Sequence, residues 1–536
     1  MPATEPHPAD SAAASQAVPQ ASSWRASSAE AEGVDPAAVL ALLDEIDAEP
    51  TIDPHAVIVL RHGAVIASAQ WAPYAIDRPQ LVYSLSKSFT STAAGFAVAE
   101  GLLDLDAPAA DYFPEYADSV APASRRILVR HLASMATGHL EDMITAFGAD
   151  REHPIRAFFA APPEREPGTL FTYNQMATYT LAVIVQRRSG QRLTEYLQPR
   201  LFEPLGIDPM GWQQQPADVD LGFSGLFAPP EAVAKLGRLY LDDGVWNGRR
   251  LLPASWVHEA TSVQVANAVP GGPVAAESDD WQQGYGFQFW MSRHGYRGDG
   301  AFGQYCIVLP EHDAIVAITS QTADMQDLID RVWKHLLPAF HDAPLAAAPE
   351  GGDALHGIVR DIAFPALRSP AALPADASGE YTRAADARSA QEYGALARAT
   401  LERVDSGWRV TLHEDVAALG GDDGWAAAVG PLRDAATPTG TVGGPVGDGV
   451  WAVTEGGESG TLEVPVAVRG GILDTDAPHG PLRVDLAFID TPHRLSLYFD
   501  PESRVVTPRW QTQALGFVGA YQLRAVRPGE TFTVAR

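Results

Sequence analysis

Two short apolar segments separated by a polar turn predict a β-hairpin early in the chain. Ala56–Leu60 and Ala64–Trp71 carry the apolar side chains, and the three residues between them end in a glycine. A helix is expected before this hairpin, over Pro36–Ile46. Asp35 suits the N-cap of that helix, and proline suits its first position.

Apolar residues spaced three or four positions apart dominate the middle of the chain and predict helices. These helices are expected over Ser86–Glu100, Ile127–Met135, Tyr173–Arg188, Leu193–Leu201 and Pro229–Leu241. Strands are then expected over Tyr285–Met291, Gln304–Leu309 and Ala314–Thr319, followed by a last helix over Asp324–Leu337. This order is typical of an α+β domain in which the first and last strands share one antiparallel sheet, and we place that domain at residues 33–340.

The composition changes after this domain. Residues 341–355 are rich in Ala, Pro and Gly and are expected to be a linker. Beyond them, apolar and polar positions alternate over Leu482–Phe488 and again over Leu495–Phe499, which predicts strands. Residues 356–536 are therefore expected to form a C-terminal all-β domain, a sandwich or a small barrel, without catalytic groups.

The composition also limits where the protein acts and what it binds. Residues 1–32 lack the apolar core of a secretory signal and are expected to be a disordered arm. No apolar stretch is long enough to span a bilayer, so we expect a soluble, cytoplasmic protein. The net charge of −29 argues against nucleic acid or an anionic membrane as a partner, because phosphate groups bind to basic surfaces. The single cysteine, Cys306, excludes an internal disulfide and is expected to be buried and inert. The oligomeric state is not predicted.

The candidate catalytic motif is S-x-x-K, formed by Ser84-Leu85-Ser86-Lys87 at the start of a predicted helix. A serine there has a free backbone N–H and lies at the positive end of the helix dipole. Lys87 projects from the same face one turn later and can reach the serine hydroxyl. The chain has only three lysines, and a lysine can give up its proton where an arginine cannot. The alternative is a surface lysine beside a serine that caps the helix.

A second motif, Phe171-Thr172-Tyr173-Asn174-Gln175, also precedes a predicted helix. Tyr173 could share a proton with Lys87 and protonate a leaving group. The alternative is an ordinary core tyrosine followed by a helix-capping Asn174.

A third motif, Gly298–Gly303, has the G-x-G-x-x-G spacing of dinucleotide-binding loops, but a strand pattern follows it instead of a helix. We therefore reject nucleotide binding. Glycines that enter a strand indicate close approach of a ligand or of another backbone, with a backbone N–H directed at an acyl oxygen. The alternative is a glycine-rich turn between strands. The chain has no nucleophile elbow, P-loop or metal-ligand spacing, and we expect neither a metal nor a cofactor.

Together and in this order, the three motifs resemble the serine β-lactamase and penicillin-binding-protein superfamily. The likeness is greatest to its class C-like branch, which includes family VIII carboxylesterases and 6-aminohexanoate-dimer hydrolase. The resemblance covers residues 33–340 and is carried further by Leu81–Phe89, Val98–Asp106 and His131–Gly138. It implies a β-lactamase-like fold, an antiparallel sheet flanked by helices with an added helical subdomain.

The resemblance implies a role for each matching residue. Ser84 would be the acylated nucleophile, Lys87 its partner in proton transfer, and Tyr173 the tyrosine of a Tyr-x-Asn motif. The backbone N–H groups of Ser84 and Ala301 would form the oxyanion hole.

Two positions depart from the family pattern. Gln175 stands where Tyr-x-Asn has asparagine, and Gly298-Asp299-Gly300 stands where the family has Lys-Thr-Gly or His-x-Gly. Gln175, Asp299 and Gly300 are expected to contact the substrate. In β-lactamases the missing cation helps to hold the substrate carboxylate, so its loss disfavours an anionic β-lactam. Asp299 either faces the pocket or points away from it, to solvent or to an arginine such as Arg297.

These features predict a serine hydrolase, and a carboxylesterase or amidase acting on small-molecule esters or amides is favoured. A β-lactamase or D-aminopeptidase with altered substrate anchoring is the alternative. A binding or sensor protein that acylates without turnover is a third possibility. The natural substrate and its stereochemistry are not predicted.

Overall fold

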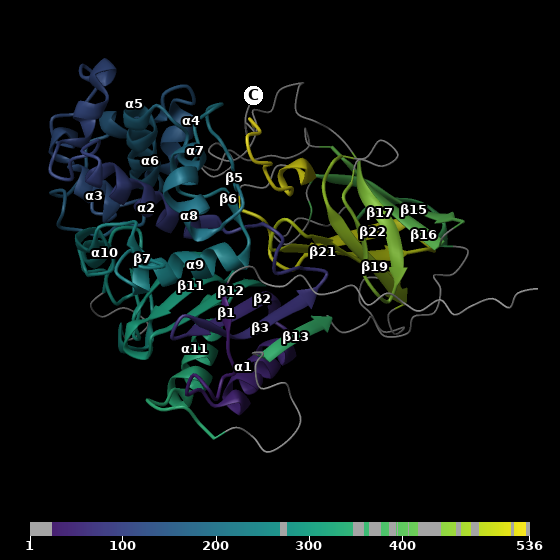
Figure 1. Ribbon diagram of the computed structural model, residues 1–536. Coiled ribbons are helices and arrows are strands. Elements are labelled where there is room, and N and C mark those ends of the chain that lie inside the picture. The colour runs from purple at the N-terminus through teal and green to yellow at the C-terminus, as the bar shows by residue number, and fades with distance from the viewer. Residues whose placement is uncertain are drawn as a thin grey trace, which may run out of the picture.

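The computed structural model describes residues 24–268, 276–346, 358–363, 377–384, 393, 395–405, 407–415, 441–456, 462–472, 482–515 and 519–531. Within these residues the chain forms a part that combines helices with a sheet and, beside it, a part built from strands (Figure 1).

A sheet in the order β1-β3-β2-β12-β11-β10-β9 forms the centre of the first part, and β13 also pairs with β3. Its pairs are antiparallel, except that β1 and β13 run parallel to β3. The predicted hairpin is confirmed as β2 and β3, and β12 pairs with β2, so the first and last strands share one sheet as expected. The strands of this sheet are β1 (Arg25–Ala26), β2 (Ile52–Arg61), β3 (Ala64–Ala72), β9 (Trp290–Met291), β10 (Tyr296–Gly300), β11 (Gln304–Leu309), β12 (Ala314–Thr322) and β13 (Ile358–Ala363).

Most helices lie where helical spacing predicts them. The helices are α1 (Pro36–Ala48), α2 (Ser86–Ala99), α3 (Val129–Ala133), α4 (Ala146–Ala149), α5 (Pro154–Ala160), α6 (Gln175–Ser189), α7 (Leu193–Leu197), α8 (Glu203–Leu205), α9 (Pro230–Leu241), α10 (Ala254–Ala260) and α11 (Met325–Leu336). The Asp35 carboxylate caps α1 by accepting the N–H of Ala37, as expected. Glycines end two helices, since Gly101 after α2 and Gly190 after α6 have φ of +69° and +70°. In the described part of the chain, every helix is too short or too polar to cross a membrane.

Successive side chains of a strand point to opposite sides of the sheet. Both faces of this sheet carry buried side chains, and helices cover both. Val57 and Val59 of β2 pack in a core shared with α1 and α11. Ile58 and Leu60 face the opposite side and pack in a larger core shared with α2, α6 and α9. Figure 1 shows α1 and α11 on one side of the sheet and the remaining helices on the other. The arrangement is the β-lactamase-like α+β fold expected above.

The strand predicted over Tyr285–Met291 is wrong for most of its length, because only β9 pairs regularly with a neighbouring strand. Tyr285, Phe287 and Phe289 are buried in the helical core as part of an irregular segment. These aromatics alternate with Gly286 and Gln288 in the sequence and so resemble a strand, although Gln288 is buried as well. Shorter strands elsewhere are β4 (Gln80–Leu81), β5 (Gly211–Trp212), β6 (Leu226–Ala228), β7 (Val245–Trp246) and β8 (Arg249–Arg250).

The C-terminal all-β part is a barrel rather than a sandwich. Eight strands follow one another in the order β17-β16-β15-β14-β22-β21-β20-β19, and pairing of β17 with β19 closes the ring, while β18 pairs with β19. The strands are β14 (Gly379–Arg383), β15 (Leu396–Val404), β16 (Gly407–Glu414), β17 (Thr441–Asp448), β18 (Ala452–Thr454), β19 (Val466–Ile472), β20 (Leu482–Phe488), β21 (His493–Asp500) and β22 (Val505–Trp510). The alternating side chains of β20 and β21 fill the barrel core, as their pattern predicts.

Two segments differ from the expected domain boundaries. β1 falls in the expected N-terminal arm and β13 in the expected second domain, yet both pair with β3. These short strands cover the edge of β3, which would otherwise expose unpaired N–H and C=O groups. Residues 1–23 and 347–357, which include most of the expected linker, lie outside the described residues.

Buried polar contacts join the barrel to the first part. Arg494 of β21 lies 2.7 Å from the Asp53 carboxylate at the start of β2. Asp490, in the turn between β20 and β21, accepts a hydrogen bond from Arg78 at 2.7 Å, and its carbonyl accepts one from the N–H of Leu81 at 2.9 Å. The barrel therefore contacts the segment that leads directly to Ser84.

Candidate active site

Ser84 lies in a 3₁₀ turn, Tyr83–Leu85, that leads into α2. Between Leu81 and Thr90 every side chain is buried except that of Ser84, which is partly exposed. Tyr83 has a φ of +47°, a left-handed conformation that is unusual for a residue with a side chain. This sharp turn presents the Ser84 hydroxyl to solvent at the start of a helix.

Lys87 lies one turn after Ser84 and makes three short contacts. Its Nζ is 3.1 Å from Oγ of Ser84, 2.6 Å from Oε1 of Gln175 and 2.7 Å from the carbonyl oxygen of Phe223. The two carbonyl-type oxygens can only accept, so they can bind both hydrogens of a neutral amine. The amine lone pair is then left for the hydrogen of the Ser84 hydroxyl. The arrangement suits removal of the serine proton by Lys87.

The burial of Lys87 favours this neutral form. The side chain is 1% exposed, and burial lowers the pKa of Lys87 to about 7, an effect that the charges of Asp142 and Asp299 oppose. The alternative of a surface lysine is therefore wrong. A pKa near 7 makes the uncharged amine accessible at neutral pH.

Asp142 is a residue that sequence reasoning missed. Its Oδ1 accepts the backbone N–H of Gln175 at 2.8 Å and that of Ile144 at 3.1 Å, which fixes the start of α6. Burial raises the pKa of Asp142, and the hydrogen bond from Gln175 and the charge of Lys87 oppose the rise. Asp142 thus orients a partner of Lys87 and contributes to its electrostatic environment. A lone aspartate in a loop carries no sequence signal for this role, and neither does the backbone carbonyl of Phe223.

Tyr173 lies immediately before the N-cap of α6. Asn174 caps the helix by accepting a backbone N–H, as the alternative interpretation of this motif proposed. The ring of Tyr173 nevertheless lies at the site, with its centroid 4.8 Å from Nζ of Lys87, and it stacks on Trp290 at 5.3 Å. Burial raises the pKa of Tyr173, and its interaction with the Ser84 hydroxyl opposes the rise. The phenol is therefore protonated at neutral pH and can donate a proton next to Ser84.

The Gly298-Asp299-Gly300 segment forms the end of β10, beside the turn that carries Ser84. A Cβ at Gly300 would lie 2.2 Å from the carbonyl oxygen of Val82, and one at Gly298 would lie 2.8 Å from Oγ of Ser88. These glycines are needed because another backbone and a helix approach the strand closely, as the third motif predicted.

Ala301 directly follows β10 and is the expected second donor of the oxyanion hole. Gly300, the residue before Ala301, lies close to the backbone N–H of Leu85. The end of β10 therefore brings Ala301 to the turn that holds Ser84. The chain then turns through Phe302 and Gly303, with φ of +68° and +86°, into β11. The predicted strand after the third motif is thereby confirmed.

Asp299 forms a buried ion pair with Arg297, which is the alternative considered from the sequence. Nε of Arg297 lies 2.9 Å from Oδ2 of Asp299, and the two residues are 0% and 8% exposed. The guanidinium carbon lies 4.5 Å from the ring centroid of Trp281 and 5.9 Å from that of Trp290. Burial raises the pKa of Asp299, and the charge of Arg297 opposes the rise. Asp299 therefore does not act as an isolated acid facing the pocket.

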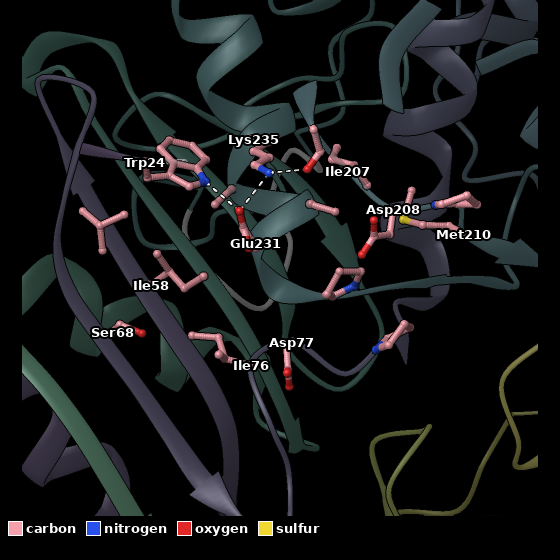
Figure 2. A pocket seen from close by; sticks show the side chains of 17 residues that line it. Trp24, Ile58, Ser68, Ile76, Asp77, Ile207, Asp208, Met210, Glu231 and Lys235 are labelled. Atoms are coloured by element: carbon pink, nitrogen blue, oxygen red, sulfur yellow. Dashed lines mark hydrogen bonds and ion pairs between the residues drawn. The ribbon is translucent and has the colours of Figure 1, made fainter. Parts of the chain in front are cut away.

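A separate cavity of about 340 Å³ lies among β2, β3 and α9 (Figure 2). Its polar groups bind one another: Nζ of Lys235 lies 2.8 Å from Oε1 of Glu231, and Nε1 of Trp24 donates to that same oxygen at 3.0 Å. None of the candidate site residues lines this cavity. Lys235 is thus a structural ion-pair partner, in contrast to Lys87. Within the described ranges, no group of His, Cys, Asp and Glu side chains could hold a metal ion.

A sheet covered by helices on both faces, with a buried lysine and a tyrosine beside an accessible serine, defines the class of β-lactamase-like proteins. The family model described as Beta-lactamase matches residues 41–337, more than half of the chain, and the chain belongs to this family. The expected resemblance is confirmed.

Several similar proteins are named as hydrolases or esterases. The chain is 27% identical to the 6-aminohexanoate-dimer hydrolase of Paenarthrobacter ureafaciens over 298 residues. This aligned region covers 50% of this chain and 73% of that protein. It is 25% identical over 197 residues to Esterase EstB of Burkholderia gladioli, covering 32% of this chain and 50% of that protein. Among solved structures, a putative 6-aminohexanoate-dimer hydrolase from Bacillus anthracis is similar, with a TM-score of 0.45 and 20% identity over 55% of this chain and 80% of that chain.

Proposed function

We propose that this protein is a serine hydrolase that cleaves ester or amide bonds of small molecules through an acyl-enzyme on Ser84. The supporting observation is the buried Lys87, whose Nζ lies 3.1 Å from Oγ of Ser84 and whose pKa is about 7. A base with a pKa near the working pH is well suited to proton transfer. A carboxylesterase or amidase is favoured, since the relatives include an esterase and a 6-aminohexanoate-dimer hydrolase.

In the acylation step, Oγ of Ser84 attacks the carbonyl carbon of the substrate while Lys87 takes its proton. The backbone N–H groups of Ser84 and Ala301 stabilise the negative oxygen of the tetrahedral intermediate. The leaving oxygen or nitrogen takes a proton from Tyr173, which Lys87 replaces. A water molecule then attacks the acyl carbon, its proton passes to the Lys87 and Tyr173 pair, and Ser84 leaves with a proton from that pair.

The charges at the site favour uncharged acyl compounds. Arg297 is already paired with Asp299, so the guanidinium on β10 is not available as a free cation for a substrate carboxylate. Tyr173 is partly exposed and presents an apolar ring surface beside Ser84, and the buried rings of Trp290 and Tyr285 pack against it. Hydrophobic and neutral acyl groups match this surface better than free anions do.

A panel of substrates run alongside the Ser84→Ala variant tests the proposal. p-Nitrophenyl acetate and butyrate, matched p-nitroanilides and nitrocefin report esterase, amidase and β-lactamase activity, respectively. We expect turnover of the ester or the anilide, loss of that turnover in Ser84→Ala, and a single mass adduct on Ser84 after reaction with a fluorophosphonate. Efficient turnover of nitrocefin would favour the β-lactamase alternative, and a burst without turnover would favour a sensor. Activity retained in Ser84→Ala would contradict the proposal altogether.

A further inference from the structure

A histidine of the barrel reaches the segment that carries Ser84. His493, the first residue of β21, is 0% exposed, and its Nε2 lies 2.5 Å from the hydroxyl oxygen of Tyr83. Its Nδ1 lies 3.1 Å from the carbonyl oxygen of Thr512, which can only accept. Nδ1 therefore carries the hydrogen, and Nε2 accepts a hydrogen bond from Tyr83. Burial lowers the pKa of His493 to about 3, so the ring is neutral at any working pH.

Two residues with an unfavourable backbone conformation flank the expected oxyanion hole. Tyr83 directly precedes Ser84, and Phe302 directly follows Ala301. Their φ angles are +47° and +68°, in the left-handed region that side chains disfavour. Such conformations persist only where the surrounding structure holds them.

His493 contacts both of these residues. The three rings meet edge to face, with centroid distances of 5.8 Å between Tyr83 and His493, 5.1 Å between Phe302 and His493, and 5.3 Å between Tyr83 and Phe302. One side chain from the barrel thus holds the two positions next to the two expected N–H donors.

We propose that His493 is a positioning residue of the active site, which holds Tyr83 and Phe302 so that the N–H groups of Ser84 and Ala301 form the oxyanion hole. The barrel then contributes to catalysis through a positioning contact, although residues 356–536 are expected to carry no catalytic groups themselves. This inference rests on the proposed acyl transfer at Ser84, because an oxyanion hole serves that reaction.

Loss of this support has a distinctive kinetic signature. A misplaced N–H donor weakens binding of the tetrahedral intermediate more than binding of the substrate. The value of kcat should therefore fall while KM stays nearly constant, and the affinity for a boronic acid that mimics the intermediate should fall in proportion to kcat. A purely structural role would instead lower the thermal stability and the amount of active protein without changing the kcat of the folded fraction.

The experiment compares His493→Ala, His493→Gln, Tyr83→Phe and the double variant Tyr83→Phe/His493→Gln in the full chain. Activity on the best substrate of the panel, fluorophosphonate labelling of Ser84, boronic acid affinity and melting temperature are measured for each. His413→Ala is the matched control, because His413 lies on β16 of the same barrel and bonds Thr400 within the barrel.

We expect kcat to fall about 10- to 100-fold in His493→Ala, less than the loss of a whole oxyanion donor. Tyr83→Phe removes one hydrogen bond and should lose about 2- to 10-fold. His493→Gln keeps an acceptor near Tyr83 and should recover part of the loss, while the double variant should be no worse than its more damaged single variant. His413→Ala should retain the kcat of the unmodified protein.

Two results would overturn the inference. In the first, the folded His493→Ala and Tyr83→Phe variants keep kcat and the fluorophosphonate labelling of Ser84 within twofold of the unmodified protein, which is itself fully reactive. If His493→Ala does not fold, Tyr83→Phe and His493→Gln decide the question by the same criterion. The other is an unmodified protein that neither turns over any substrate nor reacts with the fluorophosphonate, which would refute the proposed function and this inference with it.

Discussion

Nε of Arg297 donates to Oδ2 of Asp299 at 2.9 Å, and these two side chains of β10 form a buried ion pair whose guanidinium lies over the rings of Trp281 and Trp290. Each charge is tolerated in this place because the other is present. Removal of one partner leaves a buried charge without compensation, which is far more costly than removal of both. The two partners therefore depend on each other, and together they keep this part of the site electrically neutral.

Asp299→Asn should accordingly destabilise the protein by about 3 to 5 kcal/mol in urea unfolding. Arg297→Met should cost a similar amount, and the double variant should cost less than the sum of the two. Asp118→Asn, which changes an exposed aspartate, is the control and should have little effect. Unchanged stability of Asp299→Asn, together with better kcat/KM for anionic substrates, would show instead that Asp299 faces the pocket as a free acid.

The pH dependence of activity should follow the protonation of Lys87. In the proposed mechanism the neutral amine is the active form, and burial lowers the pKa of Lys87 to about 7, so kcat/KM should rise as the pH increases through about 7. Asp142→Asn removes a negative charge that favours protonated Lys87, while its amide oxygen can still accept the N–H of Gln175. The acid limb should therefore move to lower pH in this variant.

The control for that shift is Glu141→Gln, which removes the neighbouring exposed carboxylate and should leave the limb in place. Profiles of kcat/KM from pH 5 to 9 measure both variants. An acid limb that Asp142→Asn leaves unmoved, or moves upward, would exclude Lys87 as the group that titrates.

Lys87→Arg should be nearly as damaging as Lys87→Ala, with kcat reduced about 10²- to 10⁴-fold in each. Arginine keeps the positive charge but cannot exchange a proton at working pH. Lys235→Arg is the matched control, since Lys235 is equally buried but pairs with Glu231 away from Ser84. If Lys87→Arg kept most of the activity, Lys87 would act only through its charge.

Asp485 should make the stability of the barrel sensitive to acid. Burial alone would raise the pKa of Asp485, but the guanidinium groups of Arg483, Arg494 and Arg469 lower it to about 2. A lowered carboxyl pKa contributes stability that is fully present above the ordinary value and is lost as the pH falls towards the folded value. The free energy of unfolding should therefore decrease between about pH 4 and pH 2 by about 2 kcal/mol.

Urea unfolding at a series of pH values measures this loss. Asp485→Asn should be less stable at pH 7 and should lack this part of the acid dependence, because it has no carboxyl group to protonate. Equal slopes for the two proteins between pH 4 and pH 2 would show that other carboxyl groups dominate.

Local signals in the sequence were sufficient for much of the fold. Asp35 marks a helix start through its capping preference, and the structure confirms it; Gly101 and Gly190 mark helix ends through their freedom to adopt a positive φ. The segment from Tyr285 to Met291 misled because an alternation of apolar with small or polar residues does not specify which backbone groups pair, and here the whole segment is buried. β1 and β13, of two and six residues, were missed because the position of so short an edge strand is determined by the sheet edge with which it pairs.

The candidate site residues likewise fall into those that local sequence patterns predict and those that they do not. Ser84, Lys87 and Tyr173 lie close to one another because short motifs place them at the starts of two helices that pack together. Asp142 and His493 could not be predicted, because their roles depend on contacts across 33 and 410 positions of the chain. Long-range contacts of this kind follow from the packing of whole elements, which no local pattern records.

The packing at Gly298 sets an evolutionary barrier between this site and one that accepts carboxylate substrates. A Cβ there would lie 2.8 Å from Oγ of Ser88, and that hydroxyl donates to the carbonyl of Gln288 at 3.0 Å inside the core. A lysine introduced at position 298 would therefore collide with α2 before its charge could be of use. A lineage that gained this cation would first have to turn or remove the Ser88 hydroxyl, and that change would take the donor away from the Gln288 carbonyl with no benefit of its own. A change of substrate range at this position thus depends on epistasis between Gly298 and Ser88, because both must change together. Neither of these small residues needs to touch a substrate.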